Sequence, residues 1–314
     1  MTDPAFVIEL PEGSLAIHDL TLGEARPDAP VVLAVHGITA NGLSWQRVAD
    51  EVDRRHGPGA VRFLAPDLRG RAASRTAPGP YGLAAHVEDL SSIASVFGAE
   101  PLLVGHSMGA FICALAGATH PERFRGVVLV DGGLAFPAPE SLDIDAALQA
   151  VIGPAMARLG MRFPSEAAYL EFWQEHPALG PVLRGEAGDA VRRYVLHDLV
   201  TAPDDVEQLA SSCVLEAIRA DGADVLADRA THAAVRRCVE LGLPVEFIWA
   251  SRGLLDEPQG LYDTQRIAAL ELPAEVAVHH VATANHYTVI LEAEGTAAIA
   301  DAIDRQLGLP RVHG

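Results

Sequence analysis

Short apolar runs rich in valine, leucine and isoleucine recur along the chain and alternate with segments of helical character. Unbroken runs of this length are typical of strands that are buried on both faces of a parallel sheet. An opening hairpin and six further strands are predicted at Phe6–Leu10, Leu15–His18, Val31–Val35, Val61–Ala65, Leu102–Val104, Val127–Val130, Val245–Trp249 and Val276–Val281. The alternation predicts an α/β fold with a mostly parallel, doubly wound sheet of about eight strands.

The alternation is interrupted once, because no convincing buried strand occurs between Val130 and Val245. Segments with helical character fill this interval, including Asp143–Leu159, Ser165–Glu175 and Ala187–Leu199. An insertion of this length after a core strand is expected to form a helical cap over the strand ends. We therefore predict a core of residues 1–135 and 241–314 and a cap of residues 136–240.

The charge and composition exclude several classes of protein. The formal net charge of −19 repels phosphate backbones and anionic membrane surfaces, so neither nucleic acid nor a membrane is expected as a partner. All 23 basic residues are arginines, which excludes Schiff-base chemistry and a phosphate-loop lysine. The three cysteines are too few and too scattered for a disulfide framework or a zinc cluster.

The sequence also gives an expectation about location. Its first residues lack the basic start and apolar run of a secretory signal. No stretch approaches the roughly 20 apolar residues that a membrane span needs. We therefore expect a cytoplasmic protein.

The strongest chemical motif is Gly105-His106-Ser107-Met108-Gly109, which joins a buried strand to a helix. A serine in such a turn needs a strained backbone and small neighbours that relieve the crowding. The turn would raise the Ser107 hydroxyl above the sheet. It would also put the Met108 N–H at a helix start, where it can bind an oxyanion.

With this motif the sequence resembles the α/β-hydrolase superfamily, and the resemblance extends along most of the chain. Val35-His36-Gly37-Ile38, Pro66-Asp67-Leu68-Arg69-Gly70 and Asn285-His286-Tyr287 are similar to three further motifs of that family. The resemblance implies Ser107 as the nucleophile, His286 as its base, and the Ile38 N–H as a second oxyanion donor. It also implies an inserted helical cap. We expect a loop-holding ion pair between Arg69 and Asp67, a structural hydrogen bond for His36, and a position lining the serine turn for His106.

The acid of the triad is ambiguous, because the usual family position after the seventh strand holds Gly253. Asp131 ends the sixth strand, 24 residues after Ser107, as in relatives that resemble haloalkane dehalogenases. Asp256 lies in a lengthened loop that could carry it back to the histidine. We favour Asp131, because a strand end is rigid and Gly132-Gly133 allows close backbone approach. Asp256 is the alternative.

Five residues in or near these motifs and in the cap are expected to bind substrate. They are Gly37, Trp45, Phe136, Trp173 and Tyr287. In the cap, Phe163, Tyr169 and Phe172 lie near Trp173 at helical spacing, which is typical of core packing and also of a pocket roof.

These features predict a serine hydrolase that cleaves a carboxylic ester or lactone of a largely apolar small molecule through an acyl-enzyme. No metal ion or organic cofactor is implied, and a homodimer is left open. One alternative is a carbon–carbon bond hydrolase with the same triad. Another is a ligand-binding or receptor protein on this fold.

Overall fold

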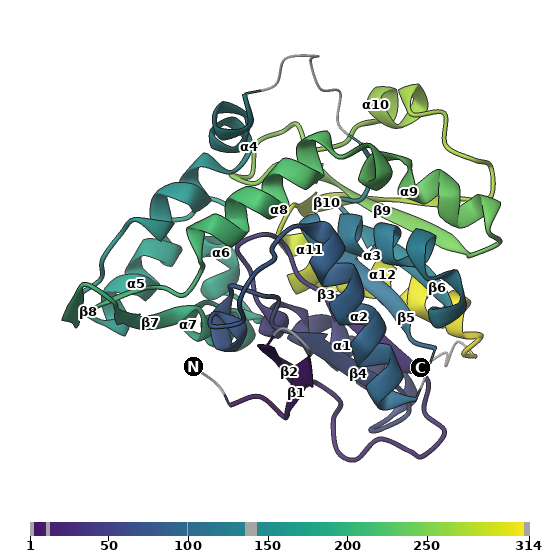
Figure 1. Ribbon diagram of the computed structural model, residues 1–314, viewed down its shortest axis with the longest axis horizontal. Helices are drawn as coiled ribbons and strands as arrows, with labels where there is room; N and C mark the ends of the chain where they lie inside the picture. The colour runs from purple at the N-terminus through teal and green to yellow at the C-terminus, as the bar shows by residue number, and fades with distance from the viewer. Residues whose placement is uncertain (1–2, 11–12, 99, 136–142, 311–314) are drawn as a thin grey trace.

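The computed structural model describes residues 3–10, 13–98, 100–135 and 143–310 of the chain (Figure 1). Eight strands form one sheet in the order β1-β2-β4-β3-β5-β6-β9-β10. Their bounds are Phe6–Leu10 for β1, Gly13–Asp19 for β2, Val31–Val35 for β3, Arg62–Pro66 for β4, Leu102–His106 for β5, Gly126–Val130 for β6, Val245–Arg252 for β9 and Ala277–Asn285 for β10.

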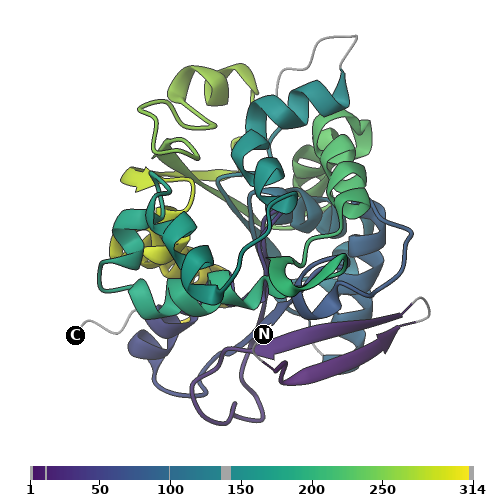
Figure 2. The same ribbon diagram turned by 90° about the vertical axis from the view of Figure 1, so that its left-hand side faces the viewer.

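The sheet is mostly parallel, as the apolar runs predict. All pairs from β4 to β10 are parallel, whereas β1 with β2 and β2 with β4 are antiparallel. The β1–β2 hairpin forms one edge of the molecule, drawn in purple in Figure 2. The predicted α/β fold is confirmed.

Helices cover both faces of the sheet (Figure 1). Alternate residues of β3 separate into two clusters, with Val32 and Ala34 in one and Leu33 and Val35 in the other, because successive side chains of a strand point to opposite faces. The first cluster includes residues of α1 (Gln46–His56) and α12 (Ala293–Leu307). The second includes residues of α2 (Leu83–Phe97), α3 (Met108–Thr119) and α9 (Arg229–Glu240).

The chain between β6 and β9 contains most of the remaining elements. They are α4 (Ile144–Leu159), α5 (Glu166–Gln174), α6 (Gly180–Leu183), α7 (Gly188–His197), β7 (Leu199–Ala202), β8 (Asp205–Ser211) and α8 (Leu215–Ala227), followed by α9. Short helices elsewhere are η1 (Gly42–Trp45), η2 (Ala72–Ser74), η3 (Pro121–Arg123), α10 (Thr264–Ala269) and α11 (Thr288–Leu291).

Two features of this insertion differ from the sequence expectation. The strands β7 and β8 pair into a small antiparallel sheet. The apolar pattern does not predict them, because few of their residues are buried and Val206 is 84% exposed. In addition, α9 packs against α3 beside the sheet, although it falls in the range predicted as cap. The division of the chain at residue 240 stays a prediction.

The longest of the described helices, α4, has 16 residues. Within the described ranges, none combines the length and the apolar character that crossing a bilayer requires.

Strand β5 and helix α3 approach each other very closely at the turn that joins them. A Cβ atom added at Gly105 would lie 2.3 Å from the carbonyl oxygen of Gly109 and 2.6 Å from the Cα of Ala110. Neither is a side-chain atom that could rotate away. The glycine at this position is therefore a packing requirement.

We predict that Gly105→Ala lowers the free energy of unfolding by about 3 kcal/mol, because the added methyl group overlaps backbone atoms. Urea unfolding followed by circular dichroism measures the change. Gly160→Ala is the matched control, since the nearest atom would be at 3.6 Å, and its effect should stay below about 1 kcal/mol. An unchanged midpoint for Gly105→Ala would contradict this account of the turn.

Candidate active site

Ser107 lies on the sharp turn between β5 and α3, with backbone angles φ 55° and ψ −124°. Positive φ is rare for a residue with a side chain and marks a strained position. At two positions around this turn, the neighbouring backbone leaves room only for glycine. A Cβ at Gly109 would lie 2.1 Å from the carbonyl oxygen of Val35, and one at Gly132 would lie 2.2 Å from that of Ser107. The turn leaves Ser107 half-buried at the end of the sheet, where its side chain lines a cavity.

Two backbone N–H groups flank this serine. Met108 begins α3, and Ile38 follows the end of β3. Neither N–H has a hydrogen-bond acceptor within the part of the chain that the structure describes. Both residues line the cavity of Ser107, which has a volume of about 60 Å³. The arrangement offers two unused backbone donors on residues that line the cavity of the hydroxyl.

The orientation of the Ile38 N–H follows from His36. The Nδ1 atom of His36 lies 2.8 Å from the carbonyl oxygen of Gly37, and the Leu68 N–H donates to Nε2 at 3.0 Å. This pattern needs a neutral ring with its proton on Nδ1, and burial lowers the pKa of His36 to about 3. Because a peptide group is planar and trans, holding the Gly37 oxygen turns the Ile38 N–H to the opposite side. His36 therefore has a structural role.

His286 directly follows β10, and its ring is held by Asp131 at the end of β6. The Nδ1 atom of His286 lies 2.7 Å from Oδ2 of Asp131. The other carboxylate oxygen accepts the Ala250 N–H at 3.1 Å, and Asp131 is fully buried. With Nδ1 bound to the carboxylate, Nε2 is at the opposite side of the ring. His286 and Ser107 line the same cavity, and no hydrogen bond joins their side chains among the described residues.

Asp256, the alternative acid, does not bind this ring. Its carboxylate pairs with Arg252 at 2.6 Å and accepts a hydrogen bond from Asn285 Nδ2 at 3.0 Å. The side chain is 31% exposed. Of the two candidates, only Asp131 contacts His286.

Two further residues hold the backbone at and just after His286. Nε2 of His106 donates to the His286 carbonyl oxygen at 2.8 Å. Burial and the neighbouring His286 ring keep the pKa of His106 well below its ordinary value, so the ring is neutral. Oδ1 of Asn285 accepts the N–H groups of Tyr287 and Thr288, at 3.0 and 2.9 Å. Asn285 belongs to the Asn285-His286-Tyr287 motif, but no role is predicted for it from the sequence; an asparagine just before a tight turn was the available signal.

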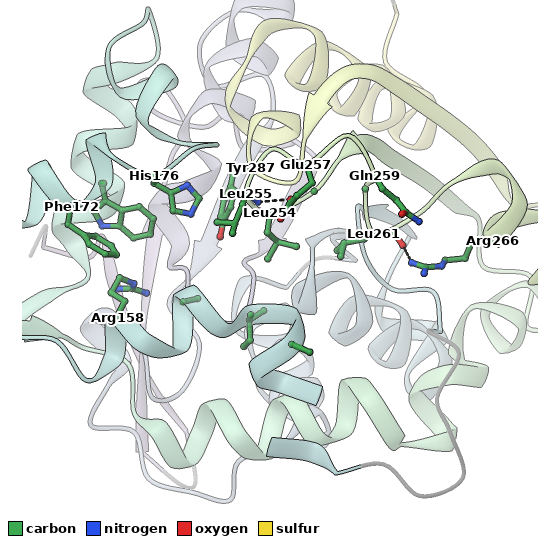
Figure 3. Close-up of a pocket in the computed structure, with 16 residues that line it drawn as sticks. Arg158, Phe172, His176, Leu254, Leu255, Glu257, Gln259, Leu261, Arg266 and Tyr287 are labelled. Atoms are coloured by element: carbon green, nitrogen blue, oxygen red, sulfur yellow. Dashed lines mark hydrogen bonds between the residues drawn. The ribbon is translucent and has the colours of Figure 1, made fainter. Parts of the chain in front are cut away.

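A larger cavity of about 470 Å³ adjoins the cavity of Ser107, and Ile152, Leu254 and Leu261 line both. In Figure 3, Arg158 and Phe172 lie at one end of it and Gln259 and Arg266 at the other. Most of the wall is apolar or aromatic. Burial raises the pKa of Tyr287 to about 12 and lowers that of His176 to about 4, so both are uncharged at neutral pH.

The residues predicted to bind substrate are distributed over different places. Trp173 and Tyr287 line the larger cavity. Gly37 lies against Ser107, since a Cβ there would be 3.6 Å from the serine Oγ. Trp45 differs from the expectation, because it is fully buried in the core and lines neither cavity. Phe136 lies outside the described residues.

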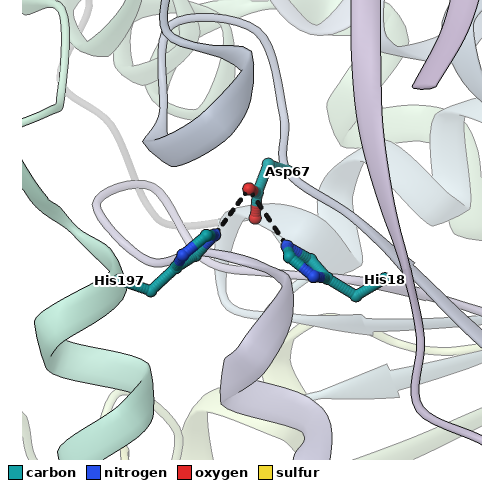
Figure 4. A group of neighbouring side chains, drawn as sticks. All are labelled: His18, Asp67 and His197. Atoms are coloured by element: carbon teal, nitrogen blue, oxygen red, sulfur yellow. Dashed lines mark hydrogen bonds and ion pairs between the residues drawn. The ribbon is translucent and has the colours of Figure 1, made fainter. Parts of the chain in front are cut away.

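The expected pair of Arg69 with Asp67 is wrong. Arg69 instead forms a two-pronged pair with Asp89, with distances of 2.6 and 2.7 Å. Asp67 lies between two histidines, with His197 Nε2 at 2.8 Å and His18 Nε2 at 3.2 Å (Figure 4). Each charged group finds a partner that is distant in the sequence.

The group of His18, Asp67 and His197 is the one set among the described residues whose ligand atoms are close enough to suggest a metal site. The Asp67 carboxylate, however, also accepts the N–H groups of Gly42 and Ala73, at 2.9 and 3.1 Å. Oδ2 thus accepts from both histidines and from Ala73, and Oδ1 accepts from Gly42, so protein donors already surround the carboxylate. Burial alone would raise the pKa of Asp67, but the hydrogen bonds from the two histidines outweigh it and hold the pKa well below its ordinary value. We interpret the group as a hydrogen-bonded junction of β2, the loop after β4 and α7.

A parallel sheet, a strained serine after its central strand and a histidine held by a strand-end carboxylate define the α/β-hydrolase class of fold. The sequence profile of the family described as alpha/beta hydrolase fold matches residues 30–293. The chain belongs to this family.

The similarity to individual curated proteins is low in identity and covers only part of the chain. The chain is 31% identical to Lipase LipV of Mycobacterium tuberculosis over 147 residues, which are 45% of this chain and 54% of the lipase. It is 28% identical to the Magnesium-chelatase 30 kDa subunit of Rhodobacter capsulatus over 191 residues, which are 57% of this chain and 60% of the subunit. The matches therefore span less than two thirds of the length of these curated relatives.

Solved structures match over nearly the whole chain. A thioesterase domain from the curacin biosynthetic pathway superposes with a TM-score of 0.70 at 17% identity, covering 95% of this chain and 97% of that one. E-2-(acetamidomethylene)succinate hydrolase gives a TM-score of 0.69 at 19% identity, covering 96% and 98%. At such identities the likeness shows the fold alone.

We predict that Asp67→Asn lowers the free energy of unfolding by about 3 kcal/mol at pH 7, because two ring N–H donors lose a buried carboxylate. The carboxylate keeps a depressed pKa in the folded protein, so its stabilisation is complete above the unfolded pKa of about 4 and is lost as the pH falls below it. The difference between wild type and variant should therefore shrink between pH 5 and pH 3.

Urea unfolding at several pH values measures this difference. Asp204→Asn is the control, because that carboxylate is exposed and pairs with Arg162 on the surface, where a loss below about 1 kcal/mol is expected. A difference that stays constant with pH would rule out an ionised Asp67 as the source of the stability.

Proposed function

We propose that the protein is a serine hydrolase that cleaves a carboxylic ester or lactone of a largely apolar small molecule through an acyl-enzyme. The observation that carries the proposal is the 2.7 Å hydrogen bond between His286 and Asp131 at the cavity that Ser107 also lines. A buried carboxylate on Nδ1 leaves Nε2 as the atom that can accept a proton. This is the arrangement that turns a serine hydroxyl into a nucleophile.

The reaction has two steps. In the first, Ser107 Oγ attacks the carbonyl carbon while His286 Nε2 takes its proton and then gives it to the departing alkoxide. In the second, water attacks the acyl-enzyme, His286 takes the water proton, and Ser107 regains a proton as the acid leaves. Asp131 orients the ring and stabilises its cation without taking the proton.

The N–H groups of Ile38 and Met108 hold the oxyanion of each tetrahedral intermediate. Neither N–H has an acceptor among the described residues, which supports this role, because unused donors at a fixed position stabilise charge that appears only in the transition state. The start of α3 adds the positive end of a helix dipole beside the oxyanion.

The cavities support a substrate with an extended apolar part. The cavity of Ser107, at about 60 Å³, holds little beyond the reacting group, and the bulk of the substrate would lie in the adjoining 470 Å³. Phe172, Trp173 and Leu255 line that larger cavity. An ester with a small group on one side of the carbonyl and a large apolar group on the other fits both cavities.

We predict that a fluorophosphonate probe labels the protein once, on Ser107, because only an activated serine displaces the fluoride at a useful rate. Mass spectrometry of the intact protein and its peptides identifies the adduct, and Ser107→Ala should give none. An unlabelled wild type would favour a ligand-binding protein on this fold. A panel of esters, lactones and β-diketones then separates ester cleavage from carbon–carbon cleavage.

The acid is tested by a matched pair of variants. Asp131→Asn should lower kcat by about 10³- to 10⁴-fold, because an amide at this position favours the wrong tautomer of His286. Asp256→Asn should keep kcat within about threefold, since its half-exposed ion pair does not reach the ring. Steady-state kinetics on one ester decides, and the reverse order of losses would assign the role to Asp256.

A further inference from the structure

Arg71 is a fully buried arginine beside the candidate active site that the proposed reaction does not use. It lies in the loop after β4, immediately before η2. Its Nε donates to the carbonyl oxygen of Ile38 at 3.0 Å, and Nη1 donates to that of Arg69 at 2.7 Å. Its Nη2 lies 3.9 Å from the sulfur of Met108. One guanidinium group thus contacts both residues whose N–H groups flank Ser107.

The charge of Arg71 is balanced by Asp221 on α8. Oδ2 of Asp221 lies 2.6 Å from Arg71 Nη1 and 3.0 Å from His86 Nε2, and Oδ1 accepts the Gly82 N–H at 2.8 Å. Burial alone would raise the pKa of Asp221, but the Arg71 charge and the bonds from His86 and Gly82 outweigh it and keep the pKa well below its ordinary value. Asp221 is therefore a carboxylate, and both side chains of the pair are completely buried.

Helix α8 also forms a wall of the cavity at Ser107, through Gly222, Val225 and Leu226. Asp221 is adjacent to that wall in the same helix. The ion pair therefore fixes this helix to the loop after β4, from which Arg71 also holds the Ile38 carbonyl oxygen. Two side chains hold successive carbonyl groups of the loop after β3. His36 holds that of Gly37, and Arg71 holds that of Ile38.

We propose that Arg71 is a positioning residue for the oxyanion site, which it aligns by holding the Ile38 carbonyl and the Met108 side chain, with Asp221 as its anchor on α8. The inference rests on the proposed function. Two planar peptide groups in succession are fixed by side chains on either side, so the Ile38 N–H cannot swing away from the N–H of Met108. Convergence of the two donors on one point matters most in the transition state, where the oxyanion carries full charge.

The choice of variant follows from the geometry of the side chain. Lysine keeps the charge but offers one nitrogen in place of a planar fork, so Arg71→Lys can pair with Asp221 and lose the Ile38 carbonyl. We expect kcat to fall by about 10- to 100-fold while KM changes by less than about threefold, because substrate binding does not use the oxyanion donors fully. Affinity for a boronic acid, which forms a tetrahedral adduct on serine, should fall by a similar factor.

The control is Arg69→Lys, which breaks the comparable buried pair with Asp89 in the same loop. The Arg69 side chain donates to Asp89 and to the carbonyl oxygen of Pro78. Both variants should lose stability to urea, but only Arg71→Lys should lose kcat and boronate affinity. If both variants keep kcat within threefold of wild type, Arg71 is only a structural ion pair and the proposal is overturned.

A second variant covers the case in which Arg71→Lys does not fold. In Asp221→Asn the anchor loses its charge while Arg71 keeps its other acceptors, and kcat should fall by about tenfold with KM unchanged; an unchanged kcat overturns the proposal. Failure of the proposed function is separate. It would appear as hydrolysis that survives Ser107→Ala, whereas failure of this inference leaves that variant inactive.

Discussion

The site depends on a close approach of backbone segments around one serine. The end of β3, the turn from β5 into α3 and the end of β6 meet so tightly that Gly105, Gly109 and Gly132 have no room for a methyl group. This contact forces Ser107 into a positive φ and turns its side chain toward the cavity. It also brings the Met108 N–H, the loop of Ile38 and the carboxylate of Asp131 to the same end of the sheet. The free energy for the strain comes from the two apolar clusters that fix the sheet between its helices.

The histidine is held differently, by separate contacts to its ring and to its backbone. Asp131 binds the ring, His106 binds the carbonyl oxygen, and Asn285 shapes the turn that follows. Each contact comes from a different strand end, which is possible because parallel strands finish at one edge of the sheet. Of the two other buried histidines at the site, His36 can accept the Leu68 N–H only while it is neutral, and burial keeps both His36 and His106 in that form.

Local patterns account for what the sequence could predict. Short stretches of consecutive residues indicate the buried strands, the serine turn and the late histidine. The strand-end position of Asp131 follows from the predicted strand that precedes it. Partners that are far apart in the sequence were not predictable in this way. Asp67 and His197 are 130 positions apart, and nothing in the motif around Asp67 indicates that Arg69 would pair elsewhere. The exposed ribbon of β7 and β8 lacks the apolar run that marks a core strand, and Trp45 follows a site motif but packs into the core.

The central claim is that Ser107, His286 and Asp131 act together with the N–H groups of Ile38 and Met108. A crystal structure of the protein after reaction with a phosphonate tests it most directly. The account predicts a covalent bond from Ser107 Oγ to phosphorus, one phosphonyl oxygen within about 3 Å of both N–H groups, and the His286 ring still on Asp131. A phosphonyl oxygen that points away from both donors, or a His286 ring turned from Ser107, would contradict it.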